Sequence, residues 1–217
     1  MSRRNNASRR CPRCLMHQSL CVCALVPSLV TRTRLVLVIH RIEARKPTNT
    51  GKLAARCIVN SEVVVRGHED RPTPPLESDD ASQPVFLFPH PDAVPLESFA
   101  RSAKPVTLIV PDGTWRQASK VRARVPGLRD VPCASLPVEE RSSYRLRSEA
   151  HAHGLSTIEA IARAMGILEG DAVRRAIEHV FRAMVDRTLW SRGEVSTEAV
   201  TGGVPAGAMR HDPTSGL

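Results

Sequence analysis

Aromatic side chains are scarce in this chain of 217 residues, which has four Phe, two Trp and one Tyr. So few rings argue against the domains that bind single-stranded nucleic acid by stacking bases on an aromatic sheet surface. Long apolar runs are also missing, since runs such as 35–39 and 106–110 are far shorter than the roughly 20 residues that a membrane-spanning helix needs. The sequence therefore predicts neither an aromatic RNA-binding sheet nor a membrane protein.

The Arg-rich N-terminus lacks an apolar stretch before a small-residue cleavage site, so no secretory signal is expected and the predicted location is the cytoplasm. Lysine is rare, because only four of the 31 basic residues are Lys. This excess of arginine reflects either genome composition or phosphate recognition, and the sequence leaves both open. The hydrophobic fraction of 41% is enough to fill the core of one domain with an appendage.

Acidic residues are missing from residues 1–34, which contain seven arginines and carry most of the net charge of +9. Residues 62–97 are acidic, and residues 101–147 form a second basic region. A polyanion is the predicted partner of the two basic regions. The alternative is that the arginines only solvate an exposed surface.

Strand and helix patterns alternate along the chain, which predicts an α/β fold. Short apolar runs rich in β-branched residues predict buried strands at 35–39, 63–65, 85–88, 106–110 and 131–136. Helical patterns cover 50–59, 97–103, 115–125, 157–168 and 171–190. The acidic, proline-rich segment 69–84 is typical of an exposed loop, and the Gly- and Pro-rich segment 196–217 is typical of a disordered tail.

Four cysteines lie within thirteen residues near the N-terminus, as Cys11-x-x-Cys14 and Cys21-x-Cys23. Four thiolates at this spacing can bind one tetrahedral zinc ion in a closed, structural site. The alternatives are two disulfides, which a cytoplasmic location disfavours, an iron–sulfur centre and a redox use of the thiols. We therefore expect a basic zinc-knuckle segment at 1–30, a catalytic domain at 31–195 and the tail at 196–217.

Two predicted helices begin with capping boxes, Thr114 to Gln117 and Ser156 to Glu159. Ligands of open α/β sheets usually bind in loops that leave the carboxyl ends of strands. Pro111-Asp-Gly-Thr-Trp115 is such a loop, and it leaves Asp112 at a strand end. Asp112 is thus a candidate catalytic residue, although an Asp-Gly pair can also simply close an Asx-turn.

The string Asp112-Gly-Thr-Trp115, with the cysteine cluster upstream, resembles the DTW-domain family of tRNA-uridine aminocarboxypropyltransferases. Three further segments agree with that family in order and spacing, and the resemblance covers about residues 11–170. These segments are His40-Arg-Ile-Glu43 leading to Thr48-Asn-Thr-Gly51, Tyr144-Arg-Leu-Arg147, and Leu155-Ser-Thr-Ile-Glu-Ala160.

The resemblance implies a SPOUT-like α/β domain with a trefoil knot around the cofactor. It also implies transfer of the 3-amino-3-carboxypropyl group of S-adenosylmethionine to N3 of a uridine in tRNA, which releases methylthioadenosine. Three alternatives stay open: the same transfer onto ribosomal RNA, a SPOUT-like methyl transfer, and a non-catalytic zinc-knuckle RNA-binding protein.

Under this resemblance Asp112 either accepts the N3 proton or orients the amino group of the cofactor. Backbone N–H groups at the Thr114 or Ser156 helix start, or Arg145 and Arg147, would bind the carboxylate of the transferred group. The implied cofactor-binding residues are Phe88, Pro89, Pro111, Gly113, Thr114, Trp115, Ser135, Leu136, Leu155, Ser156 and Thr157. The implied substrate-binding residues are His40, Arg41, Glu43, Asn49, Thr50, Tyr144, Arg145 and Arg147.

Several of these residues have structural explanations as well. Trp115 either stacks on a ring or packs beneath its helix. A histidine at a strand end such as His40 often only makes a structural hydrogen bond, and Thr50 could cap the helix that follows it.

Overall fold

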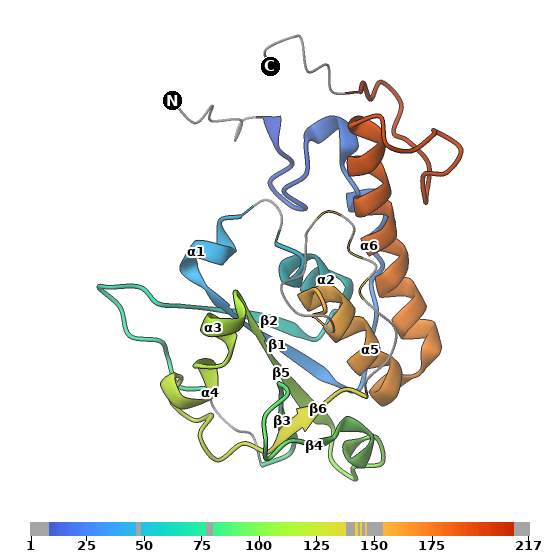
Figure 1. Cartoon of the computed structure of the whole chain (residues 1–217). Helices are drawn as coiled ribbons and strands as arrows, with labels where there is room; N and C mark the ends of the chain where they lie inside the picture. The colour runs from blue at the N-terminus through green and yellow to red at the C-terminus, as the bar shows by residue number, and fades with distance from the viewer. Residues whose placement is uncertain are drawn as a thin grey trace.

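A parallel sheet of six strands forms the centre of the fold in the computed structural model of the chain (Figure 1). The structure describes residues 9–46, 49–76, 80–137, 142, 144, 146 and 154–210. The strands are β1 (Arg34–His40), β2 (Ser61–Arg66), β3 (Gln83–Leu87), β4 (Val94–Pro95), β5 (Val106–Asp112) and β6 (Cys133–Ser135). Their order in the sheet is β2-β1-β5-β3-β6-β4, so β5 lies in the interior between β1 and β3.

Helices cover both faces of the sheet, with α2, α5 and α6 on one face and α3 and α4 on the other (Figure 1). The helices are α1 (Arg41–Ala44), α2 (Gly51–Cys57), α3 (Trp115–Ala118), α4 (Val121–Arg124), α5 (Thr157–Glu169) and α6 (Asp171–Ser191). Short 3-10 turns are η2 (Gln18–Leu20), η3 (Cys23–Leu25) and η4 (Leu96–Phe99). The parallel α/β fold that the sequence predicts is confirmed.

The strands are continuous apolar runs because both of their faces are covered. All seven residues of β5 are buried, and so are the five central residues of β1. Neighbouring side chains of a strand point to opposite faces, so Leu37 packs in the core under α5 and α6, whereas Val38 packs in the core under α4. This arrangement makes the interior strands rigid supports for the residues at their carboxyl ends.

The helix expected at 115–125 is interrupted, because α3 and α4 are separate turns joined by Ser119 and Lys120. Both joining residues keep right-handed helical backbone angles, so the segment stays coiled without a continuous ladder of hydrogen bonds. Val125 is extended, as expected for a residue before proline, and this ends α4. The helix expected at 97–103 is the short turn η4, and the two-residue strand β4 was not expected.

The segment expected to be disordered is described as far as residue 210, and its first part packs on α6. Val200 is buried in the same core as α6. The backbone N–H and the hydroxyl of Thr201 both donate to Oδ2 of Asp186, at 3.1 and 2.6 Å. Small residues allow this close packing, which composition alone does not reveal.

No helix in the described part of the chain is long and apolar enough to cross a membrane.

Candidate functional site

Asp112 is the last residue of β5 and lies at the carboxyl edge of the sheet, where its side chain is buried. Nδ2 of Asn49 donates a hydrogen bond to its Oδ2 at 2.6 Å, and Oγ1 of Thr157 donates to its Oδ1 at 2.7 Å. Asn49 precedes α2, and Thr157 is the first residue of α5. Three segments that are distant in the sequence therefore meet at one carboxylate.

The start of α2 approaches this carboxylate very closely at Gly51. A Cβ atom at this position would lie 2.5 Å from Oδ2 of Asp112, so only glycine fits without a shift. Oδ1 of Asn49 accepts a hydrogen bond from the N–H of Lys52 at 3.0 Å, whereas Thr50 makes no capping bond with its side chain. Asn49 thus binds the helix with one end of its amide and Asp112 with the other. Gly51 belongs to one of the strings that resemble the family, but its contact with Asp112 is visible only in the fold.

Burial raises the pKa of Asp112 above its ordinary value. The hydrogen bonds from Thr157 and Asn49 lower this pKa, and the nearby charge of Glu43 raises it. Glu43 is itself buried and forms an ion pair with Lys46, whose Nζ lies 2.6 Å from its Oε1. Glu43 therefore acts on the Asp112 carboxylate through its charge.

His40 ends β1, the strand beside β5, and Arg41 is the first residue of α1. Nδ1 of His40 accepts from the N–H of Ile42 at 3.3 Å, so the ring caps α1. Burial lowers the pKa of His40, and the charges of Arg66 and Arg41 lower it further, so the ring stays neutral and able to accept this bond. Arg41 forms an ion pair with Glu69.

Some of the residues expected to bind the cofactor follow strands on the other side of β5, and others lead into α5. Phe88 and Pro89 follow β3, Ser135 and Leu136 lie at the end of β6, and 155–157 lead into α5. Because all these strands are parallel, their carboxyl ends meet at the edge that carries Asp112.

The loop after Asp112 is fixed by a complete capping box. Oγ1 of Thr114 accepts from the N–H of Gln117 at 3.3 Å, and Oε1 of Gln117 accepts from the N–H of Thr114 at 2.8 Å. Pro111 is buried in β5, and Gly113 has a φ of 149° with the side chain of Gln117 against it. The backbone path from strand to helix is thereby determined.

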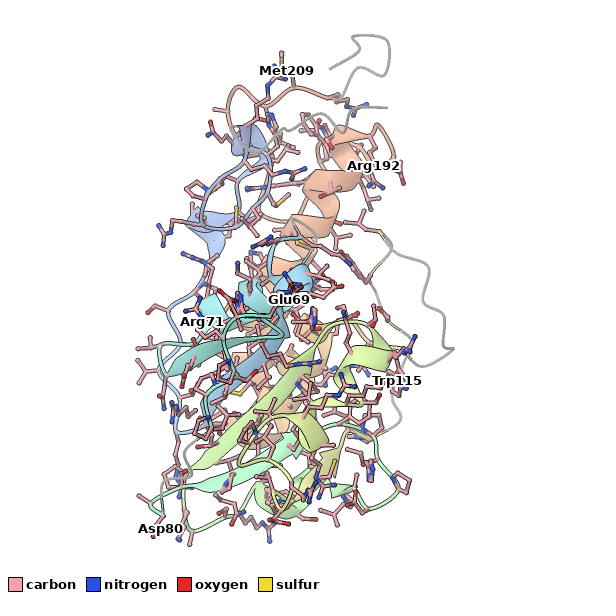
Figure 2. All side chains as sticks on the ribbon, turned by 90° about the vertical axis from the view of Figure 1, so that its left-hand side faces the viewer. Glu69, Arg71, Asp80, Trp115, Arg192 and Met209 are labelled. Atoms are coloured by element: carbon pink, nitrogen blue, oxygen red, sulfur yellow. The ribbon has the colours of Figure 1, made fainter. Side chains whose placement is uncertain are left out.

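Trp115 does not pack beneath its helix, because 52% of its surface is exposed. Its ring centroid lies 5.0 Å from that of Phe88, which is buried at the end of β3. Figure 2 shows Trp115 at the surface of the molecule. The pair presents an aromatic surface next to the Asp112 loop, on which a flat ring can stack.

Tyr144 is a core residue in the structure. It is buried, and its ring centroid lies 5.4 Å from that of Phe181 in α6. Its N–H donates to Oγ of Ser142 at 3.1 Å, and this hydroxyl donates to Oε2 of Glu159 at 2.6 Å. Tyr144 thus attaches its segment to α5 and α6, while Arg145 and Arg147 lie outside the described residues.

The sulfur atoms of the four N-terminal cysteines lie within 4.8 Å of one another. Sγ of Cys11 is 3.6 Å from Sγ of Cys23, and Sγ of Cys14 is 3.7 Å from Sγ of Cys21. Zn–S bonds of about 2.3 Å in a tetrahedron place the sulfurs about 3.8 Å apart, so the cluster fits a zinc ion. All six cysteines lie among the described residues and are free of disulfides.

Comparisons with known proteins give the following similarities. A family model described as DTW domain matches residues 8–189. The chain is 28% identical over 171 residues to "tRNA-uridine aminocarboxypropyltransferase 2" of Drosophila melanogaster, which covers 76% of this chain and 68% of that protein. It is 31% identical over 173 residues to the protein of the same name from Macaca fascicularis, covering 75% of this chain and 58% of that protein. A solved structure, the SAM-dependent rRNA:acp-transferase Tsr3 from Vulcanisaeta distributa, has a TM-score of 0.47 and 17% identity over 74% of this chain and 79% of that one.

Proposed function

Because this chain belongs to the DTW domain family, we propose that it is an RNA-modifying transferase. It would move the 3-amino-3-carboxypropyl group of S-adenosylmethionine to N3 of a uridine in tRNA. The observation that carries the proposal is the convergence of Asn49 and Thr157 on the Asp112 carboxylate. These residues come from three of the strings that resemble the family, and the fold brings them into direct contact.

When bound, S-adenosylmethionine would supply a γ-carbon that its sulfonium activates. Formation of the N3–C bond would break the C–S bond and leave the electron pair of that bond on the sulfur of methylthioadenosine. The N3 atom would lose its proton. Asp112 would accept that proton. Its raised pKa makes it a better base than an exposed aspartate at the pH where it is ionised. Asn49, Thr157 and the backbone N–H of Gly113 use three of about four lone-pair positions of the carboxylate, which leaves one for the N3–H. The alternative role, orienting the amino group of the cofactor, uses the same free position.

The position of β5 supports this division of roles. The proposed uridine-side residues His40 and Arg41 lie at the carboxyl end of β1, and the proposed cofactor-side residue Phe88 follows β3. Asp112 lies on the strand between them, as a base acting between donor and acceptor must. Trp115 would offer its exposed face to an adenine or uracil ring. Holding two reactants in line in this way lowers the activation free energy of the transfer by a large part.

The trefoil knot, the domain boundaries and a cytoplasmic location stay part of this proposal. Six free cysteines suit a reducing compartment. The four clustered cysteines would hold a structural zinc ion in the basic N-terminal segment, which would bind RNA. The names of the curated relatives favour tRNA as the acceptor over ribosomal RNA.

The test is nucleoside mass spectrometry after purified protein acts on unmodified tRNA and, separately, on ribosomal RNA. We expect 3-(3-amino-3-carboxypropyl)uridine in tRNA and none in ribosomal RNA. The reverse pattern would keep the chemistry and overturn the acceptor. Tight RNA binding without any transfer would overturn the proposal that the protein is an enzyme. Asp130→Asn, an exposed aspartate near the amino end of β6, is a matched control for Asp112→Asn.

A further inference from the structure

Arg187 of α6 is a buried arginine with 5% of its surface exposed. Its guanidinium donates to three backbone carbonyls. Nε donates to the carbonyl of Gly203 at 2.9 Å, Nη2 donates to that of Gly202 at 3.2 Å, and Nη1 donates to that of Cys21. One guanidinium thus joins α6, the cysteine cluster and the C-terminal segment, which we define as residues 196–210.

This buried charge lacks a carboxylate partner. In the described part of the chain no Asp or Glu lies within ion-pair distance of Arg187. The adjacent Asp186 points elsewhere, since its Oδ2 accepts both bonds from Thr201. Burial of a cation without a counter-charge costs free energy of folding, so we expect an anion near Arg187.

The cysteine cluster supplies that anion when it holds a metal. A zinc ion bound by four thiolates carries about two net negative charges. Nη1 of Arg187 donates to the carbonyl of Cys21, which places the guanidinium beside the cluster. We propose that Arg187 is the charge partner of the metal-loaded cysteine cluster, and that metal binding and docking of the C-terminal segment are one coupled equilibrium.

The C-terminal segment also contacts the cluster region directly. Gly202 has a φ of 66°, and a Cβ atom there would lie 2.6 Å from Cδ1 of Leu25 in η3, two residues after Cys23. Nε1 of Trp190 donates to Oγ1 of Thr197 at 3.0 Å, and the guanidinium of Arg210 lies 5.7 Å from the Trp190 ring centroid. The backbone of the segment therefore packs against both α6 and the cysteine-bearing turns.

Figure 1 shows the cysteine-bearing segment and the C-terminal segment side by side at the end of α6, and Figure 2 shows Arg192 and Met209 at that same end. Residues 190–210 lie beyond the part matched by the DTW domain model. Arg187 and the four cysteines lie inside the matched residues 8–189, whereas the C-terminal segment lies outside them. The coupling does not depend on the RNA chemistry proposed above.

The coupling has a defined direction. Without metal, no common ion holds Cys21 in place, so its carbonyl is a weaker anchor for the buried guanidinium of Arg187. Docking of residues 196–210 is then weaker. By thermodynamic reciprocity, a change that undocks the segment weakens metal binding by the same factor.

The experiment titrates zinc into the metal-stripped full-length chain against a chromophoric chelator and follows amide exchange of residues 196–210. We expect zinc to slow that exchange in the native chain. Arg187→Met should weaken zinc binding by about 10- to 100-fold, the range for residues that support metal ligands, and Arg187→Lys by less. Arg182→Met, an exposed arginine of the same helix, is the matched control and should bind zinc as the native chain does.

Gly202→Ala provides a second and independent variant. It leaves the cysteines and Arg187 intact but places a methyl group against Leu25, so it should undock the segment and weaken zinc binding in parallel. Native zinc affinity in Arg187→Met, or native affinity in a Gly202→Ala protein whose segment exchanges freely, would overturn the proposal. So would equal exchange of residues 196–210 with and without zinc. If Arg187→Met does not fold, Arg187→Lys and Gly202→Ala still decide the question.

Discussion

Nδ2 of Asn49 donates a hydrogen bond of 2.6 Å to Oδ2 of Asp112, although 63 residues separate the two in the sequence. The other end of the same amide accepts from the N–H of Lys52 in the first turn of α2. Helix α2 therefore fixes the side-chain amide of Asn49, and this amide fixes the carboxylate of Asp112. We call these two hydrogen bonds of Asn49 the relay from α2 to Asp112, and they position the carboxylate of the candidate site.

Asn49→Ala should leave the protein folded but reduce transfer by roughly 100-fold, the loss typical of a misplaced reacting group. The variant removes one donor from Asp112 and the capping bond of α2. Steady-state transfer to tRNA measures the effect. The matched control is Asn60→Ala, an exposed asparagine. Equal activity of the Asn49 and Asn60 variants would contradict the relay.

Asp112→Asn should abolish transfer and, at about pH 8, raise the unfolding temperature. Burial raises the pKa of Asp112 in the folded state, so the folded chain binds this proton more tightly than the unfolded chain. The stability that this group contributes is therefore present at low pH and is lost as pH rises through the raised pKa. The asparagine of Asp112→Asn carries no charge, so the variant avoids this loss of stability as the pH rises.

The measurement is thermal unfolding of both proteins across a pH series. The advantage of Asp112→Asn should shrink as the pH falls toward the ordinary range of aspartate, where the native carboxyl is protonated in both states. An Asp112→Asn protein that is less stable than the native one at every pH would refute the assigned shift.

Gly51→Ala should lower transfer strongly, because its Cβ would lie 2.5 Å from Oδ2 of Asp112 and must displace the carboxylate or α2. An alanine inside a helix normally gains about 1 kcal/mol over glycine, and this gain should be absent here. Gly166→Ala in α5 is the control, since its Cβ would meet only the flexible side chain of Arg174. Activity and chemical denaturation of both variants test the prediction, which fails if Gly51→Ala keeps native activity.

Glu159→Ala should destabilise the protein by about 1–3 kcal/mol, the cost of leaving buried donors without an acceptor. Oε2 of Glu159 accepts from the N–H and the hydroxyl of Ser156 and from the hydroxyl of Ser142, at 2.9, 2.7 and 2.6 Å. Urea unfolding measures the loss. Glu178→Ala, in the half-buried ion pair with Arg174, should cost less, about 1 kcal/mol. Similar costs for the two variants would show that the capping network has no special role.

The parts of the site that are local in sequence could be predicted from it. The apolar run of β5 followed by Pro111-Asp-Gly-Thr placed Asp112 at a strand end, and the cysteine spacing predicted the cluster. Both depend only on neighbouring residues. The same holds for the capping boxes at Thr114 and Ser156.

The contacts of the site depend on strand order, which periodicity does not determine. Asn49 and Gly51 reach Asp112 only because β5 inserts between β1 and β3. Burial likewise needs the fold: Tyr144 lies in the core, whereas Trp115 is exposed. The C-terminal segment is described as far as residue 210, and Arg187 donates to its backbone carbonyls, which are partners that no side-chain pattern shows.

The central claim is that Asp112 serves the transfer of an aminocarboxypropyl group to RNA. The most direct test supplies tRNA and S-adenosylmethionine that carries one label in the aminocarboxypropyl carbons and another in the methyl group, with native and Asp112→Asn protein in parallel. We expect the aminocarboxypropyl label to enter uridine and the methyl label to stay in methylthioadenosine. Asp112→Asn should transfer neither label. Methyl label in the RNA, or undiminished transfer by Asp112→Asn, would contradict this claim.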